Sequence, residues 1–347
     1  MNDFLRSILE GINTIVQNHG WSIIVFTMLI RFVLMPLDIK SRKGMRQMSK
    51  MQPKINELTK KYGNDKQKLQ QKQSELFKKE HYNPLSGCLP VLIQWPILIA
   101  MFAAMRAIAN EQLIQQVFTY ISGQTPVQDS WLWIKSVWMP DSPFSSIAPD
   151  MNSLSVISAD VWTKVVNGFS PEYLAQIIAN IPNYTDGMLA FTKDMDTKTL
   201  QATIQTLYSA MQAQPAFQTA SAFVPGWKNV SLLLFSFTVY VQNNGLLILP
   251  VLAGVSQWLM TKLNPTETAP AAPQANGQPA AGQGMNSFMK YFFPLLSVYF
   301  CLTSNAGFAI YWVTSNLIAG AQSVLITRYY DRKDKLAAQA AGEGSVK

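Results

Sequence analysis

The sequence predicts an all-α polytopic membrane protein with five transmembrane helices, a cytoplasmic helical hairpin and an enlarged external domain. Only 14% of the 347 residues are charged, against about a quarter in an ordinary soluble domain. The charges also leave long gaps, because residues 85–105, 230–261 and 291–327 contain none. A hydrocarbon core about 30 Å thick needs about 20 apolar residues in a helix, so these gaps predict membrane spans.

The distribution of charge predicts which segments lie on which side of the membrane. Residues 40–79 contain 13 Lys or Arg, whereas residues 107–244 contain five Lys and nine Asp or Glu. Cations gather in cytoplasmic loops of membrane proteins. The basic segment is therefore expected in the cytoplasm and the acidic one outside, and the net charge of +8 reflects topology and does not indicate a direct nucleic-acid reader.

The first residues predict an amphipathic helix over 3–17 that lies on the membrane surface, because apolar and polar side chains alternate at helical spacing. The start has neither the pattern of a secretory signal peptide nor a lipid-attachment cysteine, so the first residues are expected to belong to the mature protein. The first span follows over residues 21–37 and is expected to end where Pro36 and Asp38 break the helix.

The basic segment predicts an antiparallel helical hairpin, although a solvated charged loop is the plainer alternative. Its first arm carries apolar residues three or four positions apart, which are Met48, Met51, Ile55, Leu58 and Tyr62. Gly63 and Asn64 then end that arm. Asp65 is the expected N-cap of a second arm with the apolar residues Leu69, Leu76 and Phe77.

The second half of the chain leaves the number of spans to be decided. Residues 230–241 are apolar but short for a span, so they predict a strand or an interfacial segment. Residues 291–327 are too long for one crossing and predict two spans that meet at Ser304, Asn305 and Gly307. Five spans place the hairpin and the basic tail on one side, whereas six would separate them, so the N-terminus is expected outside and the C-terminus in the cytoplasm.

These arguments divide the chain as follows: an external interfacial helix (1–20), span 1 (21–39), the cytoplasmic hairpin (40–84), span 2 (85–106), the external domain (107–244), span 3 (245–262), a flexible cytoplasmic linker rich in Pro, Gly, Ala and Gln (263–286), span 4 (287–304), span 5 (305–327) and a basic cytoplasmic tail (328–347).

Arg31 lies inside the first predicted span, where a charged side chain costs about 3 kcal/mol on insertion scales. No other predicted span contains a carboxylate. Water in a cavity, polar side chains or a transient guest could each compensate the charge. In the alternative interpretation the side chain snorkels to the nearer interface, about 9 Å away at helical rise.

Polar residues elsewhere in the predicted spans, one of them in the same span as Arg31, favour a wet cavity around Arg31. They are Thr27, Gln94, Gln257, Ser315, Asn316 and Gln322, and on the last span Trp312, Ser315, Asn316, Ala319 and Ser323 share one helical face. Each amide or hydroxyl alone is equally consistent with an ordinary hydrogen bond between helices. Together they make a polar intramembrane site worth testing.

Motifs for bond chemistry are lacking from the sequence. It has no phosphate-binding loop, HExxH or GxSxG pattern, and Cys88, Cys301, His19 and His81 are too few and too scattered for a disulfide framework or a metal site. We therefore expect a protein that is not an enzyme and that has no metal and no cofactor.

Four segments, in this order, resemble the YidC/Oxa/Alb family of membrane protein insertases. They are WSIIVFTMLIRFVLMPL, MSKMQPKINELTKKYGNDKQKLQQ, KKEHYNPLSGCLPVLIQWPI and GFAIYWVTSN. The resemblance covers residues 20–106 and 245–328, whereas residues 145–228 resemble no segment of the family. It implies a hydrophilic groove, open to the cytoplasm and the lipid, that receives the polar end of a nascent membrane protein. Arg31 matches the groove arginine, and the other groove positions that it implies are Gln94, Gln257, Trp312 and Asn316.

The resemblance also implies the partners and the location. The partners are nascent membrane proteins, the ribosome, membrane lipids and the Sec translocon, and the location is the bacterial inner (plasma) membrane. A small-solute channel or secondary transporter is the alternative, but a transporter should show repeated halves with broken helices, and the sequence shows no such symmetry. A surface-anchored structural or signalling protein would leave Arg31 and the basic hairpin without a role.

Overall fold

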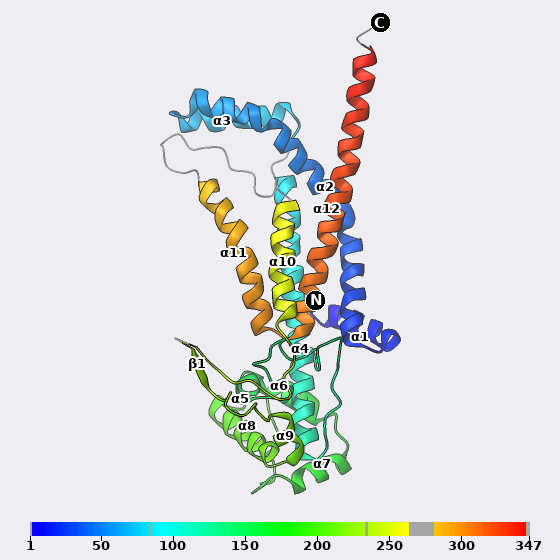
Figure 1. The fold of residues 1–347 in the computed structure, drawn as a ribbon, viewed down its shortest axis with the longest axis vertical. Helices are drawn as coiled ribbons and strands as arrows, with labels where there is room; N and C mark the ends of the chain where they lie inside the picture. Colours follow the sequence, from blue (N-terminus) through cyan, green and yellow to red (C-terminus); the bar gives the residue numbers. More distant parts are fainter. Residues whose placement is uncertain (1, 83–84, 233–234, 264–280, 345–347) are drawn as a thin grey trace. The chain divides into compact units, whose positions relative to one another are not determined.

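The computed structural model describes residues 2–82, 85–232, 235–263 and 281–344 (Figure 1). The described chain is mostly helical. Its elements are α1 (Asn2–Val16), α2 (His19–Tyr62), α3 (Lys66–Lys79), α4 (Leu85–Ile121), α5 (Met151–Ser155), α6 (Ala159–Val166), α7 (Pro171–Ala179), α8 (Thr197–Gln212), α9 (Pro215–Ala220), β1 (Val230–Leu232), β2 (Phe235–Phe237), α10 (Ile248–Leu263), α11 (Ala281–Thr303) and α12 (Ala306–Gly344). Residues 264–280 of the linker predicted over 263–286 lie outside the described residues, and residues 281–286 belong to α11 rather than to an irregular linker.

Three described helices are long and apolar enough to cross a membrane, which confirms a helical membrane protein. They lie within α2, over Trp95–Ile121 of α4 and over Ala306–Leu336 of α12. Two apolar helices among the described residues are shorter, namely Ile248–Leu263 and Tyr291–Thr303. The five-span arrangement therefore stays a prediction.

The chain forms two compact units. The first contains Met1–Ile23, Ala100–Pro250 and Cys301–Ile310, and the second contains Ile24–Ile99, Val251–Phe300 and Tyr311–Lys347. The long helices α2, α4, α10, α11 and α12 each contribute residues to both units.

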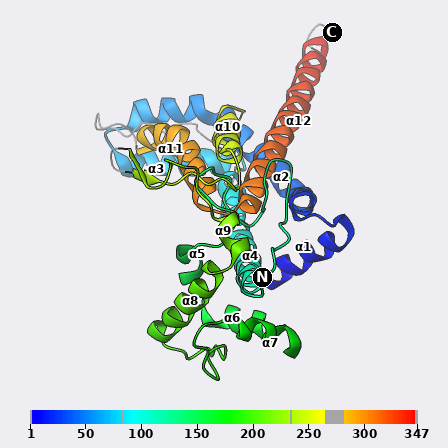
Figure 2. The ribbon, with the colours of Figure 1, turned by 60° about the horizontal axis from the view of Figure 1, so that its bottom comes forward.

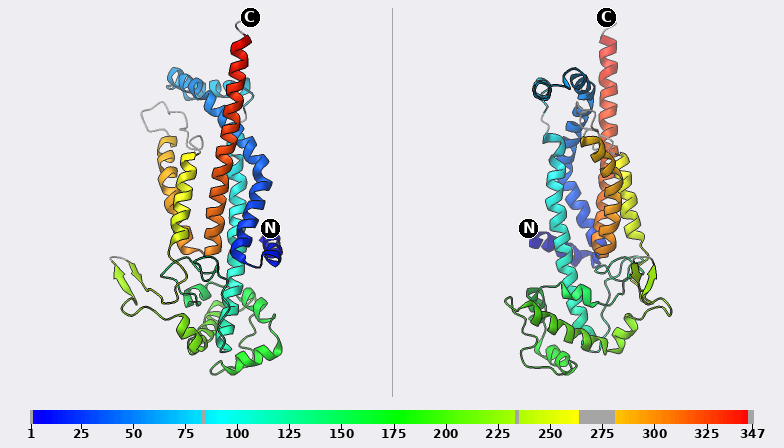
Figure 3. Two further views of the ribbon diagram at one scale, coloured as in Figure 1. Left: turned by 45° about the vertical axis from the view of Figure 1, so that its right-hand side comes forward. Right: turned by 90° about the vertical axis from the view of Figure 1, so that its left-hand side faces the viewer.

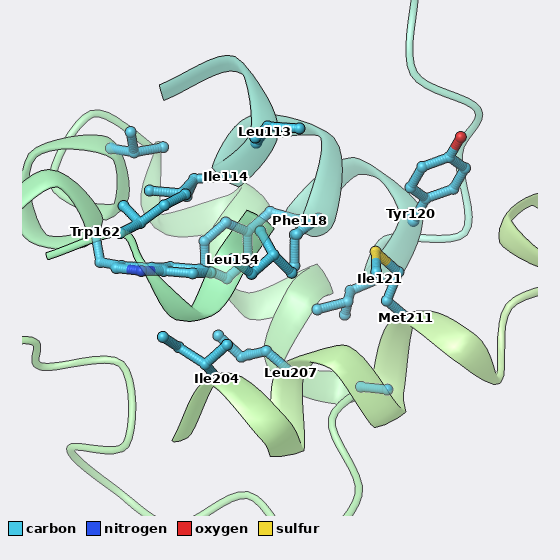
Figure 4. Close-up of a cluster of buried hydrophobic side chains, with 14 of the residues drawn as sticks. Leu113, Ile114, Phe118, Tyr120, Ile121, Leu154, Trp162, Ile204, Leu207 and Met211 are labelled. Carbon is cyan, nitrogen blue, oxygen red and sulfur yellow. The ribbon is translucent and has the colours of Figure 1, made fainter. Parts of the chain in front are cut away.

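The first unit has a large apolar core, built around the C-terminal half of α4 (Figure 4). Helices α5, α6, α8 and α9 surround this part of α4 (Figure 2). Leu113, Ile114, Val117, Phe118 and Ile121 are buried there at helical spacing. Helices α5, α6, α8 and α9 supply the facing side chains, among them Leu154, Trp162, Ile204, Leu207, Met211 and Phe217. This apolar face keeps α4 helical to Ile121, so the helix continues past residue 106, where the second span was predicted to end.

Residues 230–232 and 235–237, within the apolar segment 230–241, form strands. Strands β1 and β2 pair antiparallel, with Val230 opposite Phe237 and Ser231 opposite Ser236. The fold is therefore all-α apart from this one short two-stranded sheet among the described residues.

The second unit contains most of the apolar part of α2. Pro36 does not break this helix, contrary to the prediction, and neither does Pro53. A proline removes one backbone donor, and hydrogen bonds from Arg31 and Arg42 to α12 hold the helix on both sides of Pro36. The predicted basic tail from residue 328 continues α12 without a break as far as Gly344.

The hairpin prediction is confirmed for the packing of its two arms. Met51, Ile55 and Tyr82 are buried together, with Met48, Leu76 and Phe77 packed against them. The carboxylate of Asp65 accepts a hydrogen bond from the backbone N–H of Lys68 at 3.0 Å, so Asp65 is the N-cap of α3 as expected. The first arm is the C-terminal part of α2, not a separate helix.

Candidate polar intramembrane site

Arg31 reaches from α2 to α12 inside the second unit. Its guanidinium donates to the hydroxyl oxygen of Ser315, from Nε at 3.0 Å and from Nη2 at 2.5 Å. Ser315 is buried. A hydroxyl group accepts these hydrogen bonds without neutralising the cation, so the contact orients the guanidinium and leaves its charge in place.

The same region of α12 contacts the backbone of α2. Gln322 donates from Nε2 to the carbonyl oxygen of Arg31 at 3.4 Å. The side-chain oxygen of Gln322 is buried and has no hydrogen-bond partner in the described part of the chain. An acceptor without a partner is costly in a dry interior, so this oxygen indicates a place where water or a polar guest can bind.

A second polar cluster joins α12 to α10. Asn316 donates from Nδ2 to the hydroxyl oxygen of Ser256 and to Oε1 of Gln257, at 3.2 Å in both cases. Ser315 and Asn316 are consecutive, and successive helical residues point about 100° apart. Helix α12 therefore directs one polar side chain to α2 and the next to α10.

An open pocket of about 390 Å³ lies beside the Asn316 cluster, between α10 and α12. Its lining is mainly apolar and comprises Ser256, Leu259, Met260, Leu263, Asn316, Leu317, Gly320, Ala321, Val324 and Leu325. A Cβ atom at Gly320 would stand 3.3 Å from Sδ of Met260 and 3.5 Å from Cδ1 of Leu263. The glycine therefore allows the two helices to approach closely at one end of the pocket.

Polar contacts between α2 and α12 continue toward the hairpin. Arg42 donates from Nη1 to the hydroxyl oxygen of Ser323 at 2.6 Å. Further along, Arg46 donates to Asp331 at 2.6 Å and to Asp334 at 2.9 Å. Arginines later in α2 pair with residues later in α12. The two helices therefore run in the same chain direction.

The predicted site residues divide into three groups in the structure. Arg31 belongs to the α2–α12 contact, and Gln257 and Asn316 belong to the α10–α12 contact. Trp312 is half-buried on α12, about one turn before these two contacts. The side chain of Gln94 lies outside the described residues, so only its place in α4 is known.

The sequence pointed to some polar residues without assigning them a partner, and it missed others. Ser315 was noted only as a polar residue, yet it is the acceptor for Arg31. Arg42 and Ser256 were not noted. Asp38, two turns after Arg31 on the same helix, interacts electrostatically with Arg31 and with Arg42. The carboxylate nearest in sequence to Arg31 is thus Asp38 on the same helix, which a comparison with the other spans does not reveal.

The chain is similar to several bacterial proteins, each named membrane protein insertase YidC. It is 39% identical to that of Fusobacterium nucleatum over 39% of this chain and 58% of the relative, and 37% identical to that of Clostridium tetani over 43% and 59%. It is also 45% identical to that of Legionella pneumophila over 29% of this chain and 18% of the relative. The chain spans less than two thirds of the length of these relatives.

The model of the family described as 60Kd inner membrane protein matches residues 11–179 and 200–334, which is most of the chain. The matched residues include those of the α2–α12 and α10–α12 contacts. They also include much of the region 145–228, for which the sequence motifs gave no resemblance. The chain therefore belongs to the 60Kd inner membrane protein family, the YidC/Oxa/Alb family, and is a multi-pass protein of the bacterial inner membrane.

Proposed function

We propose that the protein is a membrane protein insertase, which receives the polar segment of a nascent membrane protein in a hydrophilic groove and releases its apolar span into lipid. The observation that carries the proposal is the oriented cation of Arg31, held on the Ser315 hydroxyl inside an apolar helix. A polar segment that crosses about 30 Å of hydrocarbon unaided faces a large desolvation cost. A polar groove shortens the dry part of that path.

Each polar group has a distinct part in the proposal. Arg31 attracts acidic segments of the guest, since its Ser315 partner leaves the cationic charge in place. The amides of Gln257 and Asn316, together with Gln322, offer hydrogen bonds to backbone groups that have lost water. Trp312 and Gln94 are assigned to the groove by the family resemblance.

The apolar pocket between α10 and α12 suits the span of the guest rather than its polar end. It adjoins Asn316, so polar and apolar surfaces meet along α12. A guest could therefore keep its polar segment near the amides while its apolar helix contacts Leu259, Leu317 and Leu325. Partitioning of that helix into lipid supplies the free energy, so no nucleotide, metal, cofactor or bond chemistry is required.

The directions of the helices support the proposed five-span topology. Within the second unit, α2, α10 and α12 run one way and α4 and α11 run the other way (Figure 3). Five crossings in this alternation place the hairpin and the end of α12 on one side. The cations of that side favour the cytoplasm, with the N-terminus outside.

The hairpin is proposed as a docking site for the ribosome or for the nascent chain, and the Sec translocon and membrane lipids are further proposed partners. Lys68, Lys78 and Lys79 are exposed on α3, while the apolar seam packs between the two arms. Deletion of residues 45–79 should lower the insertion rate more than it lowers the amount of folded protein. Insertion at the normal rate without these residues would contradict the docking role.

Photocrosslinking during translation of a small membrane protein tests the groove directly. A photoreactive amino acid is placed at position 31 in one variant and at position 257 in another. The second variant retains the arginine. The matched control is position 33, because Val33 is 74% exposed on the outer face of the same helix. Stronger crosslinks to the guest from 31 and 257 than from 33 are expected. Equal yields at all three positions would overturn the groove.

A further inference from the structure

A two-stranded ribbon on the first unit is too small to be stable on its own. Strands β1 and β2 have three residues each, and the pairing continues through Val224 N–H to Val239 O at 2.8 Å and Val241 N–H to Ala222 O at 2.9 Å. Two-stranded sheets are only marginally stable in water and need a surface to pack on.

One side of the ribbon carries an aromatic cluster, which we define as Phe144, Phe223, Trp227 and Phe237. The ring of Phe237 lies 4.9 Å from that of Phe144 and 6.4 Å from that of Trp227. Phe144, Phe223 and Trp227 are nonetheless 44%, 40% and 48% exposed. Large aromatic side chains grouped at the surface mark a contact with a partner or a membrane.

The charge near the cluster favours a membrane. Lys228 is the only charged residue in the sequence between Lys198 and Lys262. Its Nζ lies 4.8 Å from the centre of the Phe223 ring, so this lone cation stands within the aromatic cluster. Tryptophan and lysine together are typical of the membrane–water interface, where the ring packs among lipids and the ammonium group contacts phosphate.

Hydrogen bonds fix the base of the ribbon near the ends of the apolar helices. Residues 137–147 link the ribbon to these helices. Ala306 N–H at the start of α12 donates to Met139 O at 2.9 Å, and Tyr240 N–H in the ribbon donates to Pro143 O at 3.4 Å. In the same segment, Asp141 accepts from Leu249 N–H in the first turn of α10 at 2.6 Å. All these residues belong to the first unit.

We propose that the aromatic cluster and Lys228 bind the lipid-headgroup layer of the bilayer, on the side that carries residues 107–244. The unpaired edges of a two-stranded sheet cannot enter hydrocarbon, because their backbone groups would lose their hydrogen bonds. The aromatic rings need an apolar cover, and the strand edges need hydrogen-bond partners. The headgroup layer provides both. This anchoring is independent of the groove and of insertase activity.

Depth-dependent fluorescence quenching tests the anchor in liposomes that contain this protein and no other. In a background with Cys88 and Cys301 replaced by Ala, Trp227→Cys carries an apolar dye, which keeps the position apolar. The matched control carries the dye at Gln205→Cys, an exposed position on α8. Lipids brominated near the headgroup are expected to quench the dye at 227 several-fold more than at 205, and aqueous iodide should show the opposite order.

Two results would overturn the anchor. Quenching by brominated lipid that is equal at 227 and 205 would show that the cluster faces water. Protection of position 227 from iodide without quenching by lipid would show that protein covers it, either the chain itself or a second copy. A parallel variant, Lys228→Glu, should lower the lipid quenching of the dye at 227 in anionic liposomes, since it repels the phosphates.

Discussion

Arg31 and Ser315, on helices α2 and α12, are joined by two hydrogen bonds to one hydroxyl oxygen, at 3.0 and 2.5 Å. The pair fixes where the guanidinium points without supplying a counter-charge from its partner. Inside an apolar helix such a contact is expensive if its only role is structural, because two apolar residues would pack there at lower cost. The contact is therefore explained best by a function that needs the cation.

Replacement of Ser315 tests whether orientation matters. Ser315→Ala removes the acceptor for Arg31, so insertion of acidic guests should fall, though by less than when the arginine itself is removed. Ser315→Thr keeps the hydroxyl and is the matched control. Insertion rates in proteoliposomes measure the effect. Equal rates for the alanine variant, the threonine variant and the wild type would show that the hydrogen bonds do not position the guanidinium.

The proposed topology predicts the reactivity of single cysteines in intact cells. Gln67→Cys on α3 should react with an impermeant maleimide only after the cells are permeabilised, whereas Gln205→Cys on α8 should react in intact cells. Both positions are exposed in the structure, so a difference in labelling reports the side of the membrane. Labelling of position 67 in intact cells would overturn the assignment of the hairpin to the cytoplasm.

Gly245 is expected to be intolerant of any side chain, because an added Cβ would overlap Oδ1 of Asp141. That buried carboxylate accepts from the backbone N–H groups of Leu246, Leu247 and Leu249, so its displacement leaves donors at the start of α10 without an acceptor. Gly245→Ala should destabilise the protein by about 2 kcal/mol or more. The apparent Tm in detergent measures the loss.

Gly11 provides the matched control for this substitution. A Cβ added there meets nothing within 4 Å, and the residue lies inside α1. Gly11→Ala should therefore leave the Tm unchanged or raise it, since alanine favours a helix by about 1 kcal/mol over glycine. A similar fall in Tm for both variants would mean that the Asp141 contact is not the cause.

The hairpin contains an ion pair that predicts an effect of pH. Lys54 Nζ lies 2.6 Å from Oε1 of Glu80, and this hydrogen bond lowers the pKa of Glu80 below its ordinary value of 4.5. A lowered pKa means that the contribution to stability is present above pH 4.5 and is lost as the pH falls through the lowered value. The effect is small because the pair is exposed.

Charge exchange isolates this pair. Lys54→Glu or Glu80→Lys alone should increase proteolysis of the hairpin at neutral pH, and the double exchange should restore protection. In the wild type this protection should decline only at low pH, and in Glu80→Gln, which has no carboxylate to titrate at this position, that decline should be absent. Failure of the double exchange to restore protection would show that the charges are not what closes the arms.

The parts of the fold that follow from local sequence patterns were predictable. The seam of Met48, Met51 and Ile55 pairs with Leu76 and Phe77, and the cap at Asp65 forms as its side-chain chemistry requires. The ends of the long helices were not predictable, because tertiary contacts decide them. Pro36 is tolerated inside α2, and α4 continues to Ile121 because the core of the first unit buries its apolar face.

The candidate site was predictable as a set of polar residues but not as a set of partners. Arg31 and Asn316 were visible as polar groups in apolar stretches. Which helices meet depends on long-range packing, so nothing local to Ser315 marks it as the acceptor for Arg31, 284 residues earlier.

Insertion assays with Arg31 variants test the central claim most directly. Two guests are compared that differ only in whether their external segment carries acidic residues. Arg31→Lys should keep most activity on both guests, since lysine retains the single positive charge that attracts an acidic segment. Arg31→Ala should lose insertion of the acidic guest and affect the neutral guest much less. Wild-type activity of Arg31→Ala on both guests would contradict the account and remove this arginine from the mechanism.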